Sequence, residues 1–205
     1  MLYRVFDGHC DTPVELWLQE KQLRSSDLAV SLDKAAGLGG YAQFFAFCTA
    51  WIETRMPHTE HFSRALDYFL AQLRKNEDRI TLCRTAPEAE AAMQAGKCAA
   101  FLAIEGAEAV REDEGLLELA YEAGVRMVSL VWNLPNSLSG SCQTGEGHLA
   151  LGADLDGCSV LPEGFAALND YETLGRYLAD AGYPDETIQN LFCNSLMKVV
   201  KTCIM

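Results

Sequence analysis

The sequence contains eight cysteines but no Cys-x-x-Cys pair. Several cysteines lie within apolar runs, as Cys48 does directly after residues 45–47. Thiolate metal sites need closely spaced cysteines, and disulfide frameworks belong to short secreted chains. We therefore expect reduced, mostly buried thiols and a cytoplasmic protein.

Long hydrophobic runs are also missing, because no apolar stretch reaches the roughly 20 residues that cross a bilayer. The N-terminal residues MLYRVFD show no basic segment followed by an apolar one, so we expect no secretory signal. Basic residues are few, 16 against 29 acidic ones, for a net charge of −13. Such a surface repels a phosphate backbone. The expected protein binds neither nucleic acid nor a membrane.

Three common catalytic fingerprints are absent as well: the Gly-x-Ser-x-Gly elbow, the P-loop and the Rossmann glycine pattern. Their absence excludes the corresponding classes of hydrolase and nucleotide-binding protein. With 205 residues, 49% of them hydrophobic, the chain is long enough for one domain with a substantial core. It is too short for two domains of ordinary size.

Short apolar runs alternate with longer amphipathic segments. The pattern predicts strands at residues 2–6, 41–48, 80–83, 98–104, 125–131 and 148–153. It predicts helices at residues 58–76, 87–95, 114–123, 171–181 and 184–201. Because the strands are continuously apolar and alternate with helices, we expect a parallel sheet covered by helices.

Polar side chains follow the carboxyl ends of several predicted strands. They are His9, Asp11, Glu105, Asn133, Asp154 and Asp156. In an α/β barrel this end of the strands is the catalytic face.

His9 and Asp11 form the sharpest local signal. Residues i and i+2 of an extended segment project to the same side, about 6–7 Å apart. An imidazole and a carboxylate aimed at one point suit a divalent ion such as zinc. By the same alternation Asp7 would share that face, although it precedes a turn at Gly8. The alternative is a polar strand end with a capping aspartate.

The other acidic candidates leave alternatives open. Glu105 ends an apolar strand, where a carboxylate needs a metal or an ion pair with a neighbouring base. Only one of Asp154 and Asp156 can point into a barrel, because side chains alternate along a strand. The other would cap a loop or a helix. His58 and His61, at a predicted helix start, are expected to be solvated.

Four segments resemble motifs of a known protein family and occur in the same order as in that family. They are DGHCDTP (7–13), AIEGAEAV (103–110), GVRMVSLVWNLPN (124–136) and HLALGADLDG (148–157). They resemble the first, third, fourth and eighth strands of the membrane (renal) dipeptidase family. PEGF, DYETL and NSLMKVV fit the C-terminal helices of that family. The resemblance implies a TIM-barrel-type (β/α) metallo-hydrolase fold in a single domain over residues 1–205.

The resemblance also implies roles for individual residues. His9 and Asp11 would bind one zinc ion, and Glu105 would bridge two. Asp154 would contact the substrate amine and serve in proton transfer, and Asn133 would take part in substrate binding. A substrate-binding histidine of the family is replaced here by Trp132.

The chain departs from the family near residues 142–147. An apparent internal deletion there removes the fifth to seventh βα units, which supply two histidine ligands of the second zinc and an arginine for the substrate carboxylate. One metal site therefore keeps its ligands, while the other keeps only Glu105. A (β/α)₈ barrel usually takes about 250 residues. An incomplete barrel exposes strand edges and apolar surface, so the chain could form a homo-oligomer.

The function that follows is a metal-dependent dipeptidase, which hydrolyses dipeptides with metal-activated water. Glu105 and Asp154 would be its catalytic residues. Two alternatives remain open. One is a catalytically impaired or inactive dipeptidase-like remnant, favoured by the missing histidines. The other is a metal-dependent amidohydrolase with another substrate, favoured by Trp132.

Overall fold

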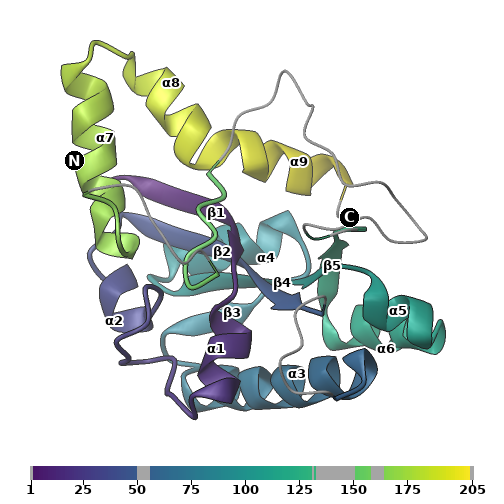
Figure 1. Ribbon diagram of the computed structural model, residues 1–205. Helices are drawn as coiled ribbons and strands as arrows, with labels where there is room; N and C mark the ends of the chain where they lie inside the picture. Colours follow the sequence, from purple (N-terminus) through teal and green to yellow (C-terminus); the bar gives the residue numbers. More distant parts are fainter. Residues whose placement is uncertain (1, 50–55, 131, 133–150, 158–163, 204–205) are drawn as a thin grey trace.

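The computed structural model describes residues 2–49, 56–130, 132, 151–157 and 164–203 (Figure 1). Its centre is a sheet of five parallel strands. They are β1 (Arg4–Cys10), β2 (Gly40–Cys48), β3 (Ile80–Leu82), β4 (Cys98–Glu105) and β5 (Val125–Val128). The strands are ordered β1-β2-β4-β3, and β5 also pairs with β4.

Strands β3 and β5 share one side of β4 by pairing with different parts of it. β3 pairs with the first residues of β4, from Cys98 to Ala100, and β5 pairs from Leu102 to Ile104. β2 runs along almost the whole of β4 on its other side. The carboxyl ends of β1, β2, β4 and β5 therefore meet at one edge of the sheet.

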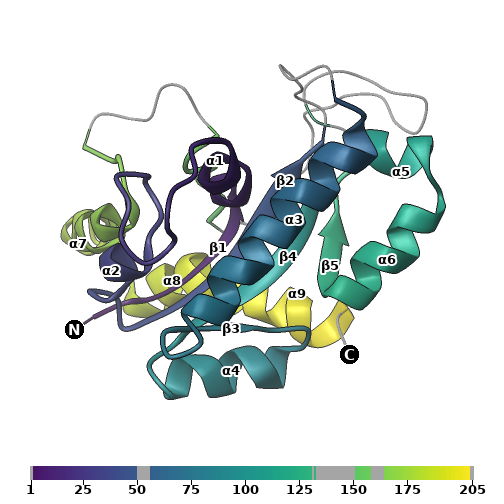
Figure 2. The ribbon, with the colours of Figure 1, turned by 90° about the horizontal axis from the view of Figure 1, so that it is seen from below.

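Helices connect successive strands, as a parallel sheet requires. They are α1 (Thr12–Leu18), α2 (Leu32–Ala35), α3 (His58–Lys75), α4 (Ala86–Gln94), α5 (Glu108–Glu112) and α6 (Gly115–Ala123). α5 and α6 lie beside β5, at the opposite end of the molecule from α7 (Tyr171–Asp180) (Figures 1 and 2). No described helix is both long and apolar enough to cross a membrane.

The sheet is buried on both faces, which explains its continuously apolar strands. On one face Phe45 and Phe47 pack with Phe69 of α3, at centroid distances of 4.8 and 6.0 Å. The other face carries a stack of Phe6, Phe44 and Phe101, one from each of three neighbouring strands. Their ring centroids lie 5.1–5.7 Å apart.

The stack belongs to a second core cluster, which includes residues of α4 and of the C-terminal helix α9 (Ser195–Cys203). The sequence predicts one helix at 184–201. The structure instead has three elements there: α8 (Asp185–Gln189), a π-helical turn (Asn190–Asn194) and α9. A 3₁₀ turn (Leu168–Asp170) leads into α7. The π turn packs against β1 and buries Phe192 and Cys193.

Residues 151–157 return to the far side of β1. Leu151 and Leu155 form parallel bridges with Asp7 and Cys10. The N–H of Gly8 donates to the Leu151 carbonyl at 2.8 Å, and that of Asp11 donates to the Leu155 carbonyl at 3.1 Å. The described end of the predicted strand at 148–153, and the turn after it, are thereby placed beside the carboxyl end of β1.

The remaining predictions differ from the structure mainly at element ends. β1 begins at Arg4 and continues through Cys10, whereas the apolar pattern predicts residues 2–6. The short helices α1, α2 and α5 are not predicted, because each is too short to show a helical period. The apparent deletion near 142–147 lies outside the described residues.

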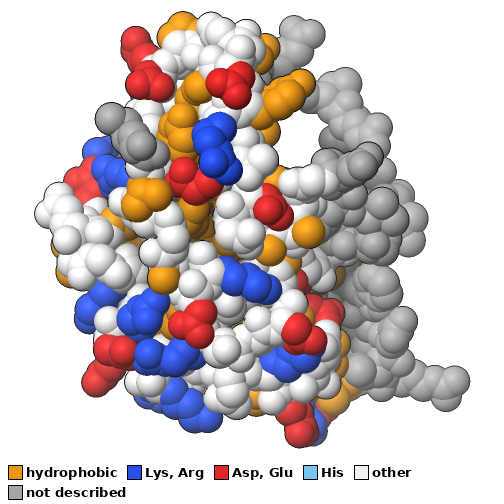
Figure 3. Space-filling view, turned by 90° about the vertical axis from the view of Figure 1, so that its left-hand side faces the viewer, with side chains coloured by type: hydrophobic (Ala, Val, Ile, Leu, Met, Phe, Trp, Pro, Cys, Tyr) orange, Lys and Arg blue, Asp and Glu red, His pale blue; other side chains and the backbone are white. Residues whose placement is uncertain are grey.

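The face of the molecule that carries α7 mixes charges of both signs. Figure 3 views the end that carries α7, where acidic and basic side chains are interspersed with small apolar patches. The excess of acidic residues is therefore not gathered on this face.

Candidate metal centre

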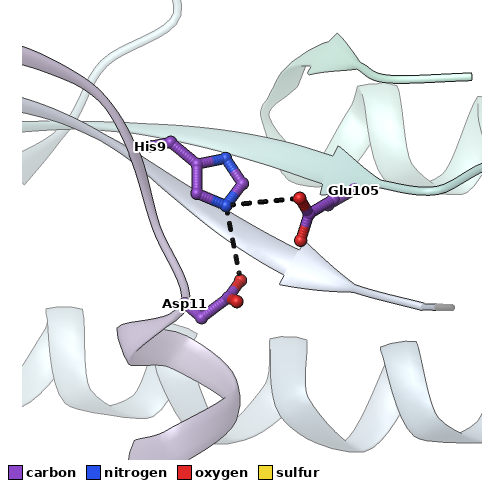
Figure 4. A group of neighbouring side chains, drawn as sticks. All are labelled: His9, Asp11 and Glu105. Atoms are coloured by element: carbon purple, nitrogen blue, oxygen red, sulfur yellow. Dashed lines mark ion pairs between the residues drawn. The ribbon is translucent and has the colours of Figure 1, made fainter. Parts of the chain in front are cut away.

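His9, Asp11 and Glu105 meet at the carboxyl edge of the sheet (Figure 4). Nε2 of His9 lies 3.6 Å from Oδ1 of Asp11 and 3.6 Å from Oε1 of Glu105. One donor atom from each residue lies within 4.8 Å of the other two. β1 thus supplies the first residue, the turn before α1 the second, and the end of β4 the third.

A β-bulge in β1 decides which face His9 occupies. Asp7 pairs with Gln43, yet Cys10 pairs with Phe45, so β1 has one extra residue between the two pairings. An extra residue reverses the alternation of side chains beyond it. Asp7 therefore faces away from Glu105 while His9 faces toward it. The prediction that Asp7 shares the face of His9 is wrong for this reason.

Asp154 reaches the same centre from residues 151–157. Its Oδ1 lies 3.3 Å from Nε2 of His9. Its backbone φ is +53°, a left-handed conformation that aspartate tolerates better than most residues. The Asp154 side chain is 39% exposed, whereas those of His9, Asp11 and Glu105 are 16–21% exposed. Asp154 therefore stands on the solvent side of the cluster.

The cluster is strongly anionic around a single imidazole. Burial lowers the pKa of His9, but contacts with Asp11, Asp154 and Glu105 outweigh burial and raise the pKa to about 12. Burial, together with the charges of Glu105 and Asp154, raises the pKa of Asp11, and His9 opposes that shift. A positive charge at the centre thus stabilises the assembled carboxylates.

The residues present fit a divalent cation. Nε2 of His9, Oδ1 of Asp11 and Oε2 of Glu105 are buried and have no hydrogen-bond partner within the described part of the chain. Buried polar atoms are seldom left in this state without a ligand or ion. One imidazole and two carboxylates form a donor set that zinc accepts, and zinc would leave a position open for substrate or water.

Gly157 leaves no room for a side chain beside the cluster. A Cβ atom at this position would lie 2.3 Å from Oδ2 of Asp11 and 2.3 Å from Oδ1 of Asp154. Its N–H donates to the backbone oxygen of Asp154 at 3.1 Å, which closes a tight turn. Any larger residue here would displace the carboxylate groups of Asp11 and Asp154.

Two hydroxyl groups hold the end of β4 in place. The Thr49 hydroxyl donates to the Gly106 carbonyl, and the N–H of Thr49 donates to the Glu105 carbonyl at 2.8 Å. From the other side, Oγ of Ser129 accepts from the N–H of Gly106 at 3.0 Å. Gly106 has φ +77°, so the chain turns directly after Glu105. The orientation of Glu105 is thus set by the residue after β2 and by the residue after β5.

Asp156 stabilises the loops around the centre and does not enter it. Its Oδ1 accepts from the N–H of Ala29 at 2.6 Å. Its Oδ2 accepts from the Thr12 hydroxyl at 2.6 Å and from the N–H of Val30 at 3.3 Å. Of the two aspartates, Asp154 contacts the cluster and Asp156 acts as the loop cap.

The histidines of α3 are engaged elsewhere. The expectation that they are solvated is wrong for His61, whereas the His58 side chain is half-buried. His61 is buried and packs edge-on against Trp17, with ring centroids 5.1 Å apart. Burial lowers the pKa of His61. His58 donates from Nδ1 to the Thr49 carbonyl, and its Nε2 lies 3.6 Å from Oε1 of Glu112. The amphipathic period of the helix predicts a buried stripe, and His61 lies on it.

One predicted site residue is not described by the structure, and three residues at the site have no counterpart among the predictions. Asn133 lies outside the described residues, so the structure does not place it. The sequence pattern does not predict Gly157, Thr49 and Ser129 as site residues, because close approaches and hydroxyl contacts leave no periodic signal in a sequence. Only Gly157 has a local indication in the sequence, because it directly follows Asp154-Leu155-Asp156.

The chain belongs to the membrane dipeptidase family, peptidase family M19, whose model matches residues 2–147. It is also 26% identical over 160 residues to an uncharacterised protein from the PQQ-III 3′ region of Acinetobacter calcoaceticus. That match covers 64% of this chain and 50% of the relative. The chain therefore spans about half the length of this curated relative.

Two solved structures share the fold. One is the M19 metallopeptidase dipeptidase AC, with a TM-score of 0.82 and 15% identity, covering 100% of this chain and 99% of that one. The other is a metallopeptidase of Rhodobacter sphaeroides bound to a phosphinate mimic of the dipeptide L-Ala-D-Ala. Its TM-score is 0.82 at 16% identity, covering 99% of this chain and 100% of that one. The α/β fold with a parallel sheet is that of M19 dipeptidases.

Proposed function

We propose that this chain is a metal-dependent dipeptidase that works with a single metal site. The observation that carries the proposal is the convergence of His9, Asp11 and Glu105, with their donor atoms within 4.8 Å of one another. Family membership supports the reaction class. The dipeptide mimic in the Rhodobacter sphaeroides structure supports a small peptide as the substrate class.

His9, Asp11 and Glu105 would hold one zinc ion. When bound, zinc supplies Lewis-acid polarisation of the substrate carbonyl and lowers the pKa of water. The rest of the chemistry belongs to the protein. Its three ligands are mostly buried, so they are held in place and shielded from competing solvent.

Asp154 is suited to the substrate because it is the most exposed carboxylate of the cluster. A dipeptide has a cationic amine, which a carboxylate at this position would bind by a charge-assisted hydrogen bond. The same group could accept a proton and return it to the leaving amine, as general acid–base catalysis requires. We also propose that Asn133 is a second substrate-binding residue.

The test combines metal content with turnover. After loading with Zn²⁺ and dialysis, we expect about one ion per chain, together with release of free amino acids from L-Ala-D-Ala. Glu105→Gln should lose both. Asp154→Asn should keep the metal and lose turnover. Glu118→Gln, at an exposed position of α6, is the matched control and should change neither.

The results would separate the two metal stoichiometries. Two tightly bound ions per chain would contradict the single-site proposal. Metal binding without hydrolysis would favour a second candidate, a metal-binding domain that does not catalyse. The observation behind that candidate is that, among the described histidines, only His9 lies at the centre, while His58 and His61 are engaged by Glu112 and Trp17.

A further inference from the structure

We propose that Asp7 is a positioning residue that fixes the backbone of His9 relative to the backbone that carries Asp154. Its catalytic consequence rests on the proposed function, whereas the arrangement itself does not. Asp7 does not touch the metal centre with its own side chain, because the bulge in β1 turns it to the opposite face of the sheet.

One carboxylate oxygen of Asp7 joins two segments that are distant in sequence. Oδ1 accepts from the N–H of His9 at 2.9 Å and from the N–H of Ala153 at 3.4 Å. His9 provides the central imidazole, and Ala153 directly precedes Asp154. The side chains of His9 and Asp154 approach each other at 3.3 Å in the centre. Behind the centre, the N–H groups of His9 and of the residue before Asp154 share one side-chain acceptor, Oδ1 of Asp7.

The β-bulge explains why an acceptor is needed there. The bulge interrupts the pairing between β1 and β2 at Gly8 and His9. The N–H of Gly8 donates instead to the Leu151 carbonyl on the other side of β1. A buried N–H group that finds no partner destabilises the fold. The side chain of Asp7 accepts from the N–H of His9, so the strand can turn His9 toward Glu105 without leaving that group unpaired.

Asp7 is itself held rigidly. Its Oδ2 accepts from the Tyr171 hydroxyl at the start of α7, and Nε2 of Gln43 lies 3.5 Å from its Oδ1. Gln43 in turn accepts from the Tyr41 hydroxyl. Asp7, Gln43 and Tyr171 are completely buried. A carboxylate fixed from β2 and from α7 can position the backbone segments that bond to it.

Burial opposes the charge of Asp7, and the donors around it favour that charge. Burial raises the pKa of Asp7 to about 6, against the effect of the His9 and Ala153 N–H groups and of Gln43. A hydrophobic side chain would avoid that cost but would supply no acceptor. The position therefore calls for an oxygen, and asparagine could supply one without the charge.

The experiment compares Asp7→Ala with Asp7→Asn in the whole chain. Each purified variant is titrated with Co²⁺, and the visible absorption of the bound ion reports its coordination. We expect Asp7→Ala to weaken Co²⁺ binding at least tenfold and to alter the spectrum. Asp7→Asn keeps an acceptor oxygen and should restore binding to within about threefold of the wild type.

A core substitution controls for lost stability. Phe69→Leu lies in α3, against the face of the sheet opposite the metal centre, and should lower the melting temperature without changing the Co²⁺ spectrum. If Asp7→Ala binds Co²⁺ with wild-type affinity and spectrum, the positioning role is wrong. The same conclusion follows if Asp7→Asn fails to improve on Asp7→Ala.

A measurement on the wild type stays decisive if Asp7→Ala does not fold or if the wild type binds no metal. Amide hydrogen exchange at His9 and Ala153 should be slow, because both N–H groups are bonded to Asp7. Exchange of either amide at the rate of an exposed loop would overturn the inference. Absence of Co²⁺ binding by a wild type with both amides protected would instead count against the proposed function alone.

Discussion

The Thr12 hydroxyl donates a 2.6 Å hydrogen bond to Asp156, which lies 144 residues further along the chain. The contact ties the first turn of α1, directly after Asp11, to the segment that carries Asp154. Both sides of the candidate metal centre are thereby joined by a bond that lies outside the centre.

We predict that Asp156→Ala separates these two segments. The variant leaves the N–H groups of Ala29 and Val30 without their acceptor and should lose about 2–3 kcal/mol of stability, as expected for a charged partner. Chemical denaturation measures this change. Thr12→Val removes only one of the three donors and should cost less, about 1 kcal/mol. Equal losses of stability in the two variants would contradict the role of Asp156 as the acceptor for all three donors.

We predict that Gly157→Ala disables the centre while the chain stays folded. An added methyl group would meet carboxylate oxygens of Asp11 and Asp154 at 2.3 Å, so both must move. Zn²⁺ affinity should fall at least tenfold, which competition with a coloured chelator can measure. Gly152→Ala is the matched control, because no atom lies within 4 Å of the added carbon. Unchanged affinity in Gly157→Ala would show that the close approach is not functional.

Thr49→Val tests how Glu105 is held. The valine has nearly the same shape but cannot donate to the Gly106 carbonyl. We expect a loss of about 1–2 kcal/mol from the unpaired buried carbonyl, and a weaker metal site. Thr49→Ser keeps the hydroxyl and should retain most of the metal affinity. A serine variant as weak as the valine variant would indicate that packing of the Thr49 methyl group, not its hydroxyl, matters.

The buried thiols predict a loss of stability at alkaline pH. Burial raises the pKa of Cys83 to about 12 from 9.0, so the folded state holds its proton more tightly than the unfolded state. The resulting stabilisation is complete below pH 9 and is lost as pH rises from 9 toward 12. Its slope is up to about 1.4 kcal/mol per pH unit. Thermal unfolding of Cys83→Ala should show a shallower decline across this range than the wild type, and parallel curves would contradict the shift.

Several features of the fold follow from local patterns. Continuous apolar runs such as 98–104 predict strands buried on both faces, and β4 is covered by helices on both. The amphipathic period of α3 also gives its bounds to within a residue. Boundaries fail where local cues are weak, as in the break of 184–201 into α8, a π turn and α9.

The residue types of the centre, their places at strand ends and the parallel α/β class follow from composition and local period. Which of these side chains meet depends on the tertiary fold. The β-bulge turns His9 toward Glu105 and Asp7 away from it, a change of face that one extra residue causes and no local period reveals. The approach of Asp154 and the space left by Gly157 depend on a segment more than 140 residues from β1, so they exist only once the chain has folded.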